Sequence, residues 1–208
     1  MRVAGRSGRF LALGDSYTIG EGVPPEGRWT HQLADTLRQE GLALDEPLTI
    51  ATTGWTTDEL QAGIAAANPG GPFDLVTLLI GVNNQYRDRS LDEYAAQFEA
   101  LLDQAITLAE GHRHHVLVVS IPDWGVTPFA RQQGRDVADT ARRIDAFNAA
   151  AQAICQGHEV DFVEITAASR VQGTDPAMLA DDGLHPSALM YAHWAAEALP
   201  SARRALRA

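Results

Sequence analysis

The sequence predicts an α/β fold, in which a parallel sheet lies between two layers of helices. Short β-rich runs alternate with longer stretches of helical periodicity along the whole chain. Several of the short runs are largely apolar, as expected of strands that are buried on both faces. The 208 residues contain no linker, repeat or low-complexity tract, and they suffice to bury a full core. We therefore expect a single domain over residues 1–208.

The first half of the chain alternates short strands with helices. A β-rich run predicts a strand at 9–13, and apolar residues at a spacing of four predict a helix at 29–40. A second strand is expected at 48–52, followed by a helix at 57–66 that ends before an Asn-Pro-Gly-Gly turn. Residues 73–80 are mostly apolar, which predicts a third strand that is buried on both faces.

The second half repeats this alternation. A serine cap and acidic residues in the first turn predict a long helix at 91–110, and a fourth buried strand is expected at 115–121. Another long helix is expected at 136–156, where a glycine ends it, followed by a fifth strand at 160–165. A last helix is expected to begin at Pro186, because proline favours the first turn of a helix.

Five strands separated by helices favour a three-layer α/β/α sandwich, for which we expect the flavodoxin-like strand order 2-1-3-4-5. Ligands of such sheets bind at the carboxyl ends of the strands. Ser16, Gly54 and Asn83 directly follow the first, second and third strands. Asp182 and His185 follow the fifth strand and a short helix. We therefore expect these five residues to gather at one edge of the sheet.

The composition excludes several classes of function. The net charge of −11 repels phosphate backbones and anionic lipids, so neither nucleic acid nor an anionic membrane surface is an expected partner. No apolar run approaches the roughly 20 residues that a membrane span needs. All 16 basic residues are arginine, which excludes chemistry that depends on a lysine, such as Schiff-base formation or a phosphate-binding loop.

Cysteine content and the N-terminus bear on the cellular compartment. Cys155 is the only cysteine, so no internal disulfide can form, and its apolar neighbours are typical of a helix core. The first nine residues carry charges but no apolar segment of the kind found in signal peptides. From these features we expect a cytoplasmic protein, and the sequence indicates no particular oligomeric state.

Ser16 is a candidate nucleophile. It stands in the segment Gly14-Asp15-Ser16-Tyr17, directly after the first expected strand. A serine hydroxyl becomes nucleophilic when a neighbouring base accepts its proton. The segment is not the Gly-x-Ser-x-Gly elbow of α/β-hydrolases, and taken alone it also fits a serine that caps a turn.

A histidine near the end of the chain supplies a candidate base. Asp182 lies three residues before His185, and Gly183 allows a sharp turn between them. A carboxylate that binds Nδ1 of the ring leaves the other ring nitrogen free to accept a proton from serine. Taken alone, the same segment also fits a solvated turn that precedes a helix.

Two further residues are candidates for stabilising a developing negative charge. Asn83 follows the third strand, and an asparagine amide can donate a hydrogen bond to an oxyanion. The backbone N–H of Gly54 can do the same after the second strand. Each residue also fits ordinary turn chemistry when it is considered separately.

The remaining histidines give little indication of a metal site. His112, His114 and His115 cluster before the fourth expected strand, but no cysteine or carboxylate accompanies them at the spacing of a metal site. We therefore expect neither a metal ion nor another cofactor.

Together these motifs resemble the GDSL, or SGNH, hydrolase family. Four blocks occur in the order of that family: Gly-Asp-Ser-Tyr at 14–17, a glycine turn at Gly54, Gly-x-Asn at 81–83 and Asp-x-x-His at 182–185. The resemblance covers nearly the whole chain and implies the SGNH hydrolase fold.

The resemblance also implies a role for each of the five residues. Ser16 is the nucleophile and the first oxyanion donor, and Gly54 and Asn83 are the other two donors. His185 is the general base, and Asp182 orients it.

The chain departs from the family pattern in a few places. Tyr17 replaces the leucine of the family name, and Asn84 stands where the family usually has an aspartate. Asp181 is a second carboxylate beside the expected orienting group, but the spacing of three residues to His185 favours Asp182.

The function that the resemblance implies is hydrolysis of a small-molecule carboxylic ester, independent of metal ions, through an acyl-enzyme on Ser16. Carbohydrate O-deacetylase, lysophospholipase and thioesterase activities are alternatives within the family. A non-catalytic flavodoxin-like binding module is an alternative from another class, since a fold alone does not determine function.

Two connections near the site have room to shape a substrate pocket. The connection at 84–90 is polar and begins with Asn84, whereas the one at 123–135 carries Trp124 and Phe129. Trp124, Val126 and Phe129 of this second connection either anchor their loop to the core, which is the commoner role of large apolar groups, or line the pocket. Asn84 is the candidate pocket residue of the first connection. Neither connection resembles the amphipathic lid of a lipase, and apolar walls suit short or medium acyl chains. We therefore expect activity on dissolved esters with short or medium acyl groups.

Overall fold

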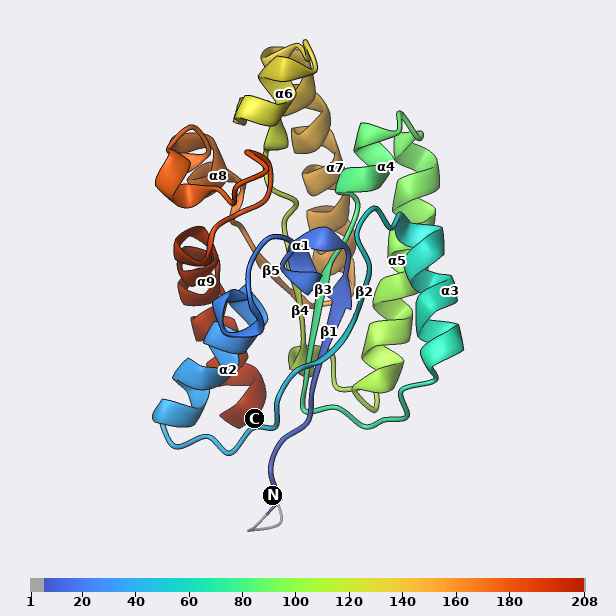
Figure 1. Ribbon diagram of the computed structural model, residues 1–208. Helices are drawn as coiled ribbons and strands as arrows, with labels where there is room; N and C mark the ends of the chain where they lie inside the picture. The colour runs from blue at the N-terminus through green and yellow to red at the C-terminus, as the bar shows by residue number, and fades with distance from the viewer. Residues whose placement is uncertain (1–5, 208) are drawn as a thin grey trace.

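The computed structural model describes residues 6–207, which fold around one parallel sheet of five strands (Figure 1). The strands are β1 (Phe10–Gly14), β2 (Leu48–Ala51), β3 (Leu75–Leu79), β4 (Val116–Val119) and β5 (Asp161–Val163). Their order in the sheet is β2-β1-β3-β4-β5, which confirms the order expected from the sequence. Each strand ends one or two residues inside the apolar run that predicts it, with the exception of β1, which extends to Gly14.

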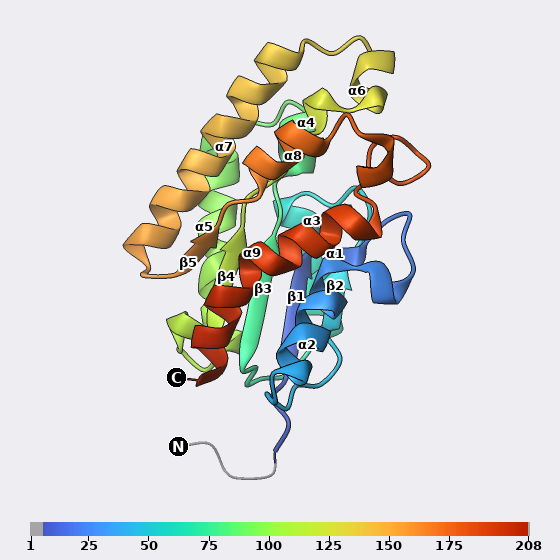
Figure 2. The ribbon, with the colours of Figure 1, turned by 90° about the vertical axis from the view of Figure 1, so that its left-hand side faces the viewer.

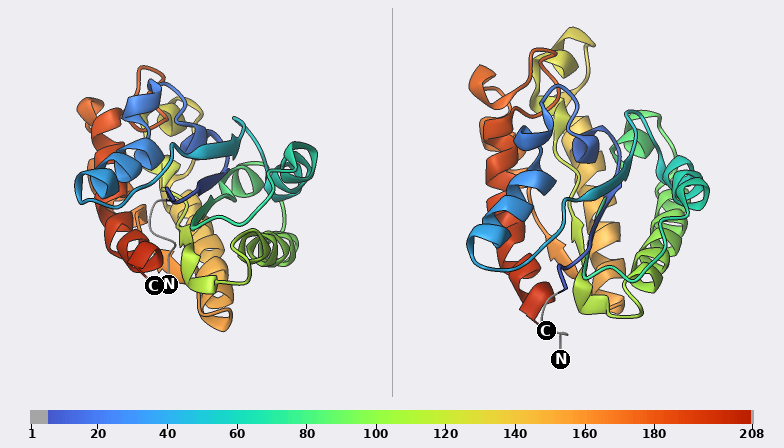
Figure 3. Two further views of the ribbon diagram at one scale, coloured as in Figure 1. Left: turned by 90° about the horizontal axis from the view of Figure 1, so that it is seen from below. Right: turned by 60° about the horizontal axis from the view of Figure 1, so that its bottom comes forward.

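Helices cover both faces of the sheet. On one face α2 (Trp29–Gln39) packs beside α9 (Ala188–Arg207). On the other face lie α3 (Thr57–Ala67), α5 (Leu91–Leu108) and α7 (Val137–Gly157). Figure 2 shows α9 running along its face of the sheet, and Figure 3 shows α2 and α9 on the opposite side from α3 and α5. The three-layer α/β/α sandwich predicted from the sequence is therefore confirmed.

The long helices are amphipathic, and α5 illustrates how its sequence specifies it. The Ser90 side chain caps the helix by accepting a hydrogen bond from the Glu93 backbone N–H at 3.1 Å. One face of the helix is apolar and packs into the core, whereas the other faces solvent. The buried side chains of α5 are Tyr94, Phe98, Leu101, Leu102 and Ala105.

No helix among residues 6–207 is both long and apolar enough to cross a membrane.

Three short helices lie in segments where the sequence pattern predicted none: α1 (Ser16–Ile19), α4 (Val82–Tyr86) and α6 (Pro128–Gln132). The first two follow β1 and β3 at the carboxyl edge of the sheet, and α6 lies between β4 and α7. Stretches of four or five residues are too short for helical periodicity to be recognisable. A fourth short helix, α8 (Thr166–Gln172), follows β5 and is the short helix expected there.

The last helix begins at Ala188 rather than at the expected Pro186. Pro186 instead pairs with Leu179 in an isolated antiparallel bridge. Next to this bridge the Ala180 N–H donates to the carbonyl oxygen of His185 at 2.8 Å. The bridge closes the chain into a tight loop, and this loop carries the candidate base.

Candidate active site

Ser16 is the first residue of α1, immediately after β1. The Asp15 side chain caps this short helix by accepting a hydrogen bond from the Tyr17 N–H at 3.0 Å. Gly14 allows β1 to approach β3 here, because a Cβ at this position would stand 2.4 Å from the carbonyl oxygen of Leu79. These contacts fix the serine at the carboxyl edge of the sheet, where it is only 5% exposed.

Asp182 and His185 form a direct pair. Nδ1 of His185 lies 2.5 Å from Oδ2 of Asp182. The other carboxylate oxygen accepts hydrogen bonds from the backbone N–H groups of Leu184 and His185, each at 2.9 Å. Gly183 supplies the turn between them with a φ of +66°. Because Nδ1 binds the carboxylate, Nε2 is the ring atom that can accept a proton.

The acidic partner of this pair is held in its ionised form. Burial raises the pKa of Asp182, but hydrogen bonds from His185 and from the Leu184 N–H outweigh this effect and keep the pKa below its ordinary value. Asp181 is exposed and makes no hydrogen bond or ion pair with any residue that the structure describes. The structure therefore places Asp182, and not Asp181, beside the histidine.

Asn83 lies on α4, just beyond β3. The chain turns into α4 at Gly81, which has a φ of +127° and packs so closely on Tyr94 that a Cβ would lie 2.5 Å from the ring. The Asn83 amide donates to the carbonyl oxygen of Trp55 at 2.9 Å and reaches Oδ2 of Asp15 at 3.4 Å. This one side chain therefore links the loops that follow β1, β2 and β3.

Gly54 lies in the loop between β2 and α3, in the left-handed conformation with a φ of +86°. Its carbonyl oxygen accepts a hydrogen bond of 2.6 Å from Nη2 of Arg87. The hydroxyl of the preceding residue, Thr53, donates to the carboxylate of Glu21. The loop is therefore held by side chains from two other parts of the chain.

A cavity of about 180 Å³ joins these loops. Ser16, Gly54, Asn83 and His185 all line it, and Asp182 binds His185 on the Nδ1 side of the ring. The structure therefore brings together the five residues that the sequence singles out. Most of the remaining wall is apolar or aromatic. It consists of Tyr17, Thr53, Val82, Tyr86, Trp124, Phe129 and Leu184.

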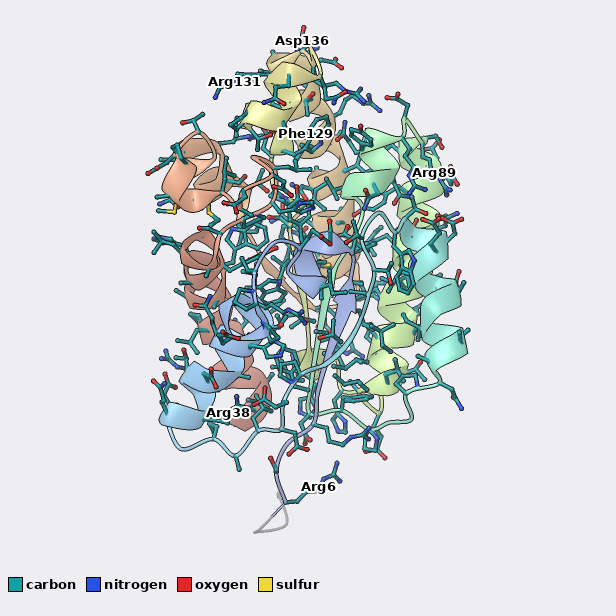
Figure 4. All side chains as sticks on the ribbon, viewed as in Figure 1. Arg6, Arg38, Arg89, Phe129, Arg131 and Asp136 are labelled. Carbon is teal, nitrogen blue, oxygen red and sulfur yellow. The ribbon has the colours of Figure 1, made fainter. Side chains whose placement is uncertain are left out.

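The three residues expected to shape the pocket lie in different places. Trp124 and Phe129 are part of the cavity wall, and Figure 4 shows Phe129 below α6, on the side of the strand ends. Asn84 does not line the cavity, which corrects the prediction. It is fully buried, and its amide donates to Oγ1 of Thr57 at 2.7 Å while its oxygen accepts from the Thr57 N–H at 3.1 Å. Adjacent helical residues do not share a face, so Asn83 faces the site while Asn84 ties α4 to α3.

Tyr86 and Leu184 are wall residues that the sequence did not indicate. The Tyr86 ring packs edge-on against Trp124 with centroids 5.2 Å apart, and the Arg135 guanidinium lies over both rings. Nε1 of Trp124 donates to Oε1 of Gln85 at 2.7 Å, which fixes the indole in the wall. A lone aromatic residue in an otherwise polar connection was the signal that could have identified Tyr86.

The histidines expected to cluster before β4 lie in and beside a short 3₁₀ turn, Arg113–His115. The rings of His112 and His115 stack with centroids 5.0 Å apart, and Nδ1 of His112 lies 3.1 Å from the carbonyl oxygen of Ala109. Within residues 6–207, no three His, Cys, Asp or Glu side chains gather in a way that could hold a metal ion.

Comparison with known families identifies the kind of protein to which this site belongs. Residues 12–193 match the GDSL-like lipase/acylhydrolase family. The chain belongs to this family. The match includes the serine, the glycine, the asparagine and the Asp-x-x-His segment of the site, and it confirms the resemblance seen in the sequence. The protein is therefore an ester-hydrolysing enzyme, and the alternative of a non-catalytic binding module is not retained.

Solved structures share the fold of this GDSL-family chain. TesA superposes with a TM-score of 0.71 at 18% identity, over 93% of this chain and 97% of TesA. Axe2, an acetylxylan esterase from Geobacillus stearothermophilus, has a TM-score of 0.71 at 21% identity, over 94% of each chain. LAE5, an alpha/beta hydrolase enzyme from the metagenome of Lake Arreo, Spain, has a TM-score of 0.73 at 19% identity, over 97% of each chain. No curated protein sequence matches the chain.

Asp15 is a fully buried carboxyl group beside the nucleophile. Burial raises its pKa from 3.8 to about 7, and the hydrogen bonds from the Tyr17 N–H and the Asn83 amide offset this only in part. Between these two values the folded protein retains a proton that the unfolded chain releases. The contribution of Asp15 to the free energy of unfolding therefore falls as the pH rises through this interval.

We expect Asp15→Asn to remove this pH-dependent cost, because an amide does not ionise. Relative to the wild type, the free energy of unfolding of the variant should increase between about pH 4 and pH 8, by up to about 4 kcal/mol. Urea unfolding followed by circular dichroism at several pH values measures this difference. The exposed Asp181→Asn variant is the control and should follow the wild type. A difference for Asp15→Asn that is the same at every pH would contradict the prediction.

Proposed function

We propose that this GDSL-family enzyme hydrolyses carboxylic esters with short or medium acyl groups through an acyl-enzyme on Ser16. The observation that carries the proposal is that Ser16 lines the same small cavity as a histidine whose Nδ1 is bound to a carboxylate. A nucleophile, a base and an orienting group in this arrangement are the components of a serine hydrolase.

In the first half of the reaction, Oγ of Ser16 attacks the carbonyl carbon of the ester and gives its proton to Nε2 of His185. Asp182 holds the ring by Nδ1 and stabilises the imidazolium that forms. The tetrahedral intermediate then collapses, the bond to the alcohol oxygen breaks, and the imidazolium protonates the departing alcohol. Water repeats the sequence on the acyl-enzyme and releases the carboxylic acid.

Three donors support this chemistry where the negative charge develops. They are the backbone N–H groups of Ser16 and Gly54 and the side-chain amide of Asn83, all in residues that line the cavity. One proton of the Asn83 amide is used by the carbonyl oxygen of Trp55 at 2.9 Å, and the other makes only a long contact of 3.4 Å with Asp15. This second proton is therefore available to an oxyanion without loss of a strong hydrogen bond.

The apolar part of the cavity favours an acyl group as its occupant. Val82, Tyr86, Trp124, Phe129 and Leu184 can bury methylene groups, each worth about 0.8 kcal/mol when it leaves water. A volume of about 180 Å³ limits the length of chain that fits. Both features support short or medium acyl esters over long-chain lipids.

An acetylated carbohydrate is a second candidate substrate. Tyr86 is only partly buried, packs edge to face against Trp124 and offers aromatic surface to a sugar ring in the cavity wall. The likeness in fold to the acetylxylan esterase Axe2 is in accord with this candidate. Lysophospholipase and thioesterase activities remain alternatives for the same serine.

We expect Ser16→Ala to fold normally and to lose at least about 10³-fold in kcat on a chromogenic short-chain ester, because only binding and the remaining donors are left. A fluorophosphonate should modify the wild-type protein at Ser16, as located by peptide mass spectrometry. Ser90→Ala removes a serine outside the cavity and should retain full activity. Labelling at another serine, or turnover by Ser16→Ala, would sink the assignment.

Asp182→Asn should lower kcat by about 10²- to 10⁴-fold, since an amide can neither stabilise the imidazolium nor hold the same ring tautomer. Asp181→Asn should change kcat by less than about 2-fold, because this side chain is exposed and makes no described contact. Steady-state kinetics of the two variants on one ester compare them directly. If Asp181→Asn proved the more damaging, the orienting role would pass to Asp181.

Phe129→Ala should shift the acyl preference towards longer chains, because it enlarges the cavity without removing a donor. The ratio of kcat/KM for octanoyl to butanoyl esters should rise by roughly 10-fold. Phe162→Ala is the matched control, since Phe162 is also partly buried but lies on β5 outside the cavity. An unchanged ratio for Phe129→Ala would place the acyl group elsewhere.

A further inference from the structure

The loop between β2 and α3 carries one of the proposed oxyanion donors, and one backbone hydrogen bond of 3.2 Å, from the Trp55 N–H to the Thr52 carbonyl oxygen, closes the turn around Gly54. Gly54 has no side chain, adopts a φ of +86° and lies at the cavity. Thr53 on one side of it is exposed, and Trp55 on the other is only partly buried. A glycine loses more conformational entropy than other residues when it is fixed, so contacts from other parts of the chain add to this one bond in holding the turn in a single conformation.

Arg87 supplies such a contact. It is the C-terminal cap of α4, and its Nη2 donates to the carbonyl oxygen of Gly54 at 2.6 Å. Hydrogen bonds from a charged donor are roughly twice as strong as neutral ones. Among the residues that the structure describes, the other side-chain contact to the backbone of this turn is the Asn83 amide on Trp55. Arg87 is therefore the side chain that binds Gly54 itself.

The guanidinium is in turn fixed by a second partner. Nη1 of Arg87 lies 3.3 Å from Oε2 of Glu59, and this carboxylate also accepts the Thr56 N–H at 2.8 Å as part of the cap of α3. Arg87 thus spans from α4 to the start of α3 across Gly54. It does not line the cavity, so it can act on the reaction only through the loop.

We propose that Arg87 is a positioning residue, which holds Gly54 in the conformation that presents its N–H to the oxyanion. The inference rests on the proposed function, in which the Gly54 N–H is one of three donors. A donor stabilises the transition state only if it is in place before the charge develops. Loss of Arg87 should therefore lower the rate of the chemical step and leave binding of the ground state nearly unchanged.

The matched pair of variants for the test is Arg87→Ala and Arg89→Ala. Arg89 is two residues away and also joins α3, since its Nη1 binds Asp58 at 2.7 Å and Glu93 at 3.2 Å. It makes no contact with Gly54 among the described residues, and Figure 4 shows it at the surface beside α3 and α4. Both substitutions remove one charge and one ion-pair network, but only Arg87→Ala frees the glycine carbonyl.

We expect Arg87→Ala to lower kcat by about 10- to 100-fold with KM within about 2-fold of the wild type, whereas Arg89→Ala keeps both constants. Arg87→Lys should recover part of the loss, because an ammonium group can bind the carbonyl but not both partners at once. Thermal unfolding of each variant checks that the substitution leaves the protein folded. Equal kcat values for the two alanine variants, or a loss confined to KM, would overturn the proposal.

A short-chain alkylboronic acid provides a readout that simple destabilisation would not change. Its tetrahedral adduct with a serine places an oxygen where the oxyanion forms, so its affinity should fall in Arg87→Ala by about the same factor as kcat. The corresponding carboxylic acid product should bind both proteins equally. Unchanged boronate affinity would overturn the positioning role. If the wild-type protein neither binds the boronate nor reacts with a fluorophosphonate, the proposed function itself fails, which is a distinct result.

Discussion

Strand β1 lies between β2 and β3, and the register pairs Gly14 with both Ala51 and Leu79. The three strands therefore end at the same level, and the loops that follow them start side by side. The rest of the site depends on this alignment, because each loop supplies one of the proposed oxyanion donors. It also depends on the absence of a side chain at Gly14, since a Cβ would lie 2.4 Å from the Leu79 carbonyl oxygen and force the strand ends apart.

The proposed base reaches this edge by a different route. His185 and Asp182 lie in the segment between β5 and α9. This segment starts from β5, which is the edge strand on the opposite side of the sheet from β2. The bridge between Leu179 and Pro186 closes that segment. Two backbone N–H groups bind one oxygen of the Asp182 carboxylate, and the ring of His185 binds the other. The geometry of the pair is thus set by its own segment. The packing of α9, which follows this segment, on the sheet places the pair at the cavity.

Polar contacts to backbone groups, rather than apolar packing, hold the catalytic loops. The Asp15 carboxyl binds a main-chain N–H of the helix that it caps, whereas the Asn83 amide and the Arg87 guanidinium each bind a main-chain carbonyl in a neighbouring loop. Such contacts define direction as well as distance, which apolar packing does not, and direction is what an oxyanion donor requires. The burial of Asp15 also lowers the free energy of unfolding at neutral pH, because it raises the pKa of this carboxyl group to about 7. The aromatic wall formed by Tyr86 and Trp124 instead acts through apolar contact, which shapes the cavity but orients no hydrogen bond.

The sequence alone determined the parallel sheet and the local Asp-x-x-His unit, because alternation of strands and helices and a spacing of three residues are properties of neighbouring residues. The strand order was only expected from the fold class, and the structure confirms it. The sequence also indicated the serine, glycine and asparagine, since each directly follows a strand. It did not separate the roles of Asn83 and Asn84, it gave no sign of Arg87, and the only signal for Tyr86 was its place as a lone aromatic residue in a polar connection. Those depend on the rotation of α4, which the contact of Asn84 with Thr57, 27 residues away, sets. A helix of five residues carries too little periodicity to reveal which side faces the site, so only the tertiary structure decides which of two adjacent amides meets the substrate.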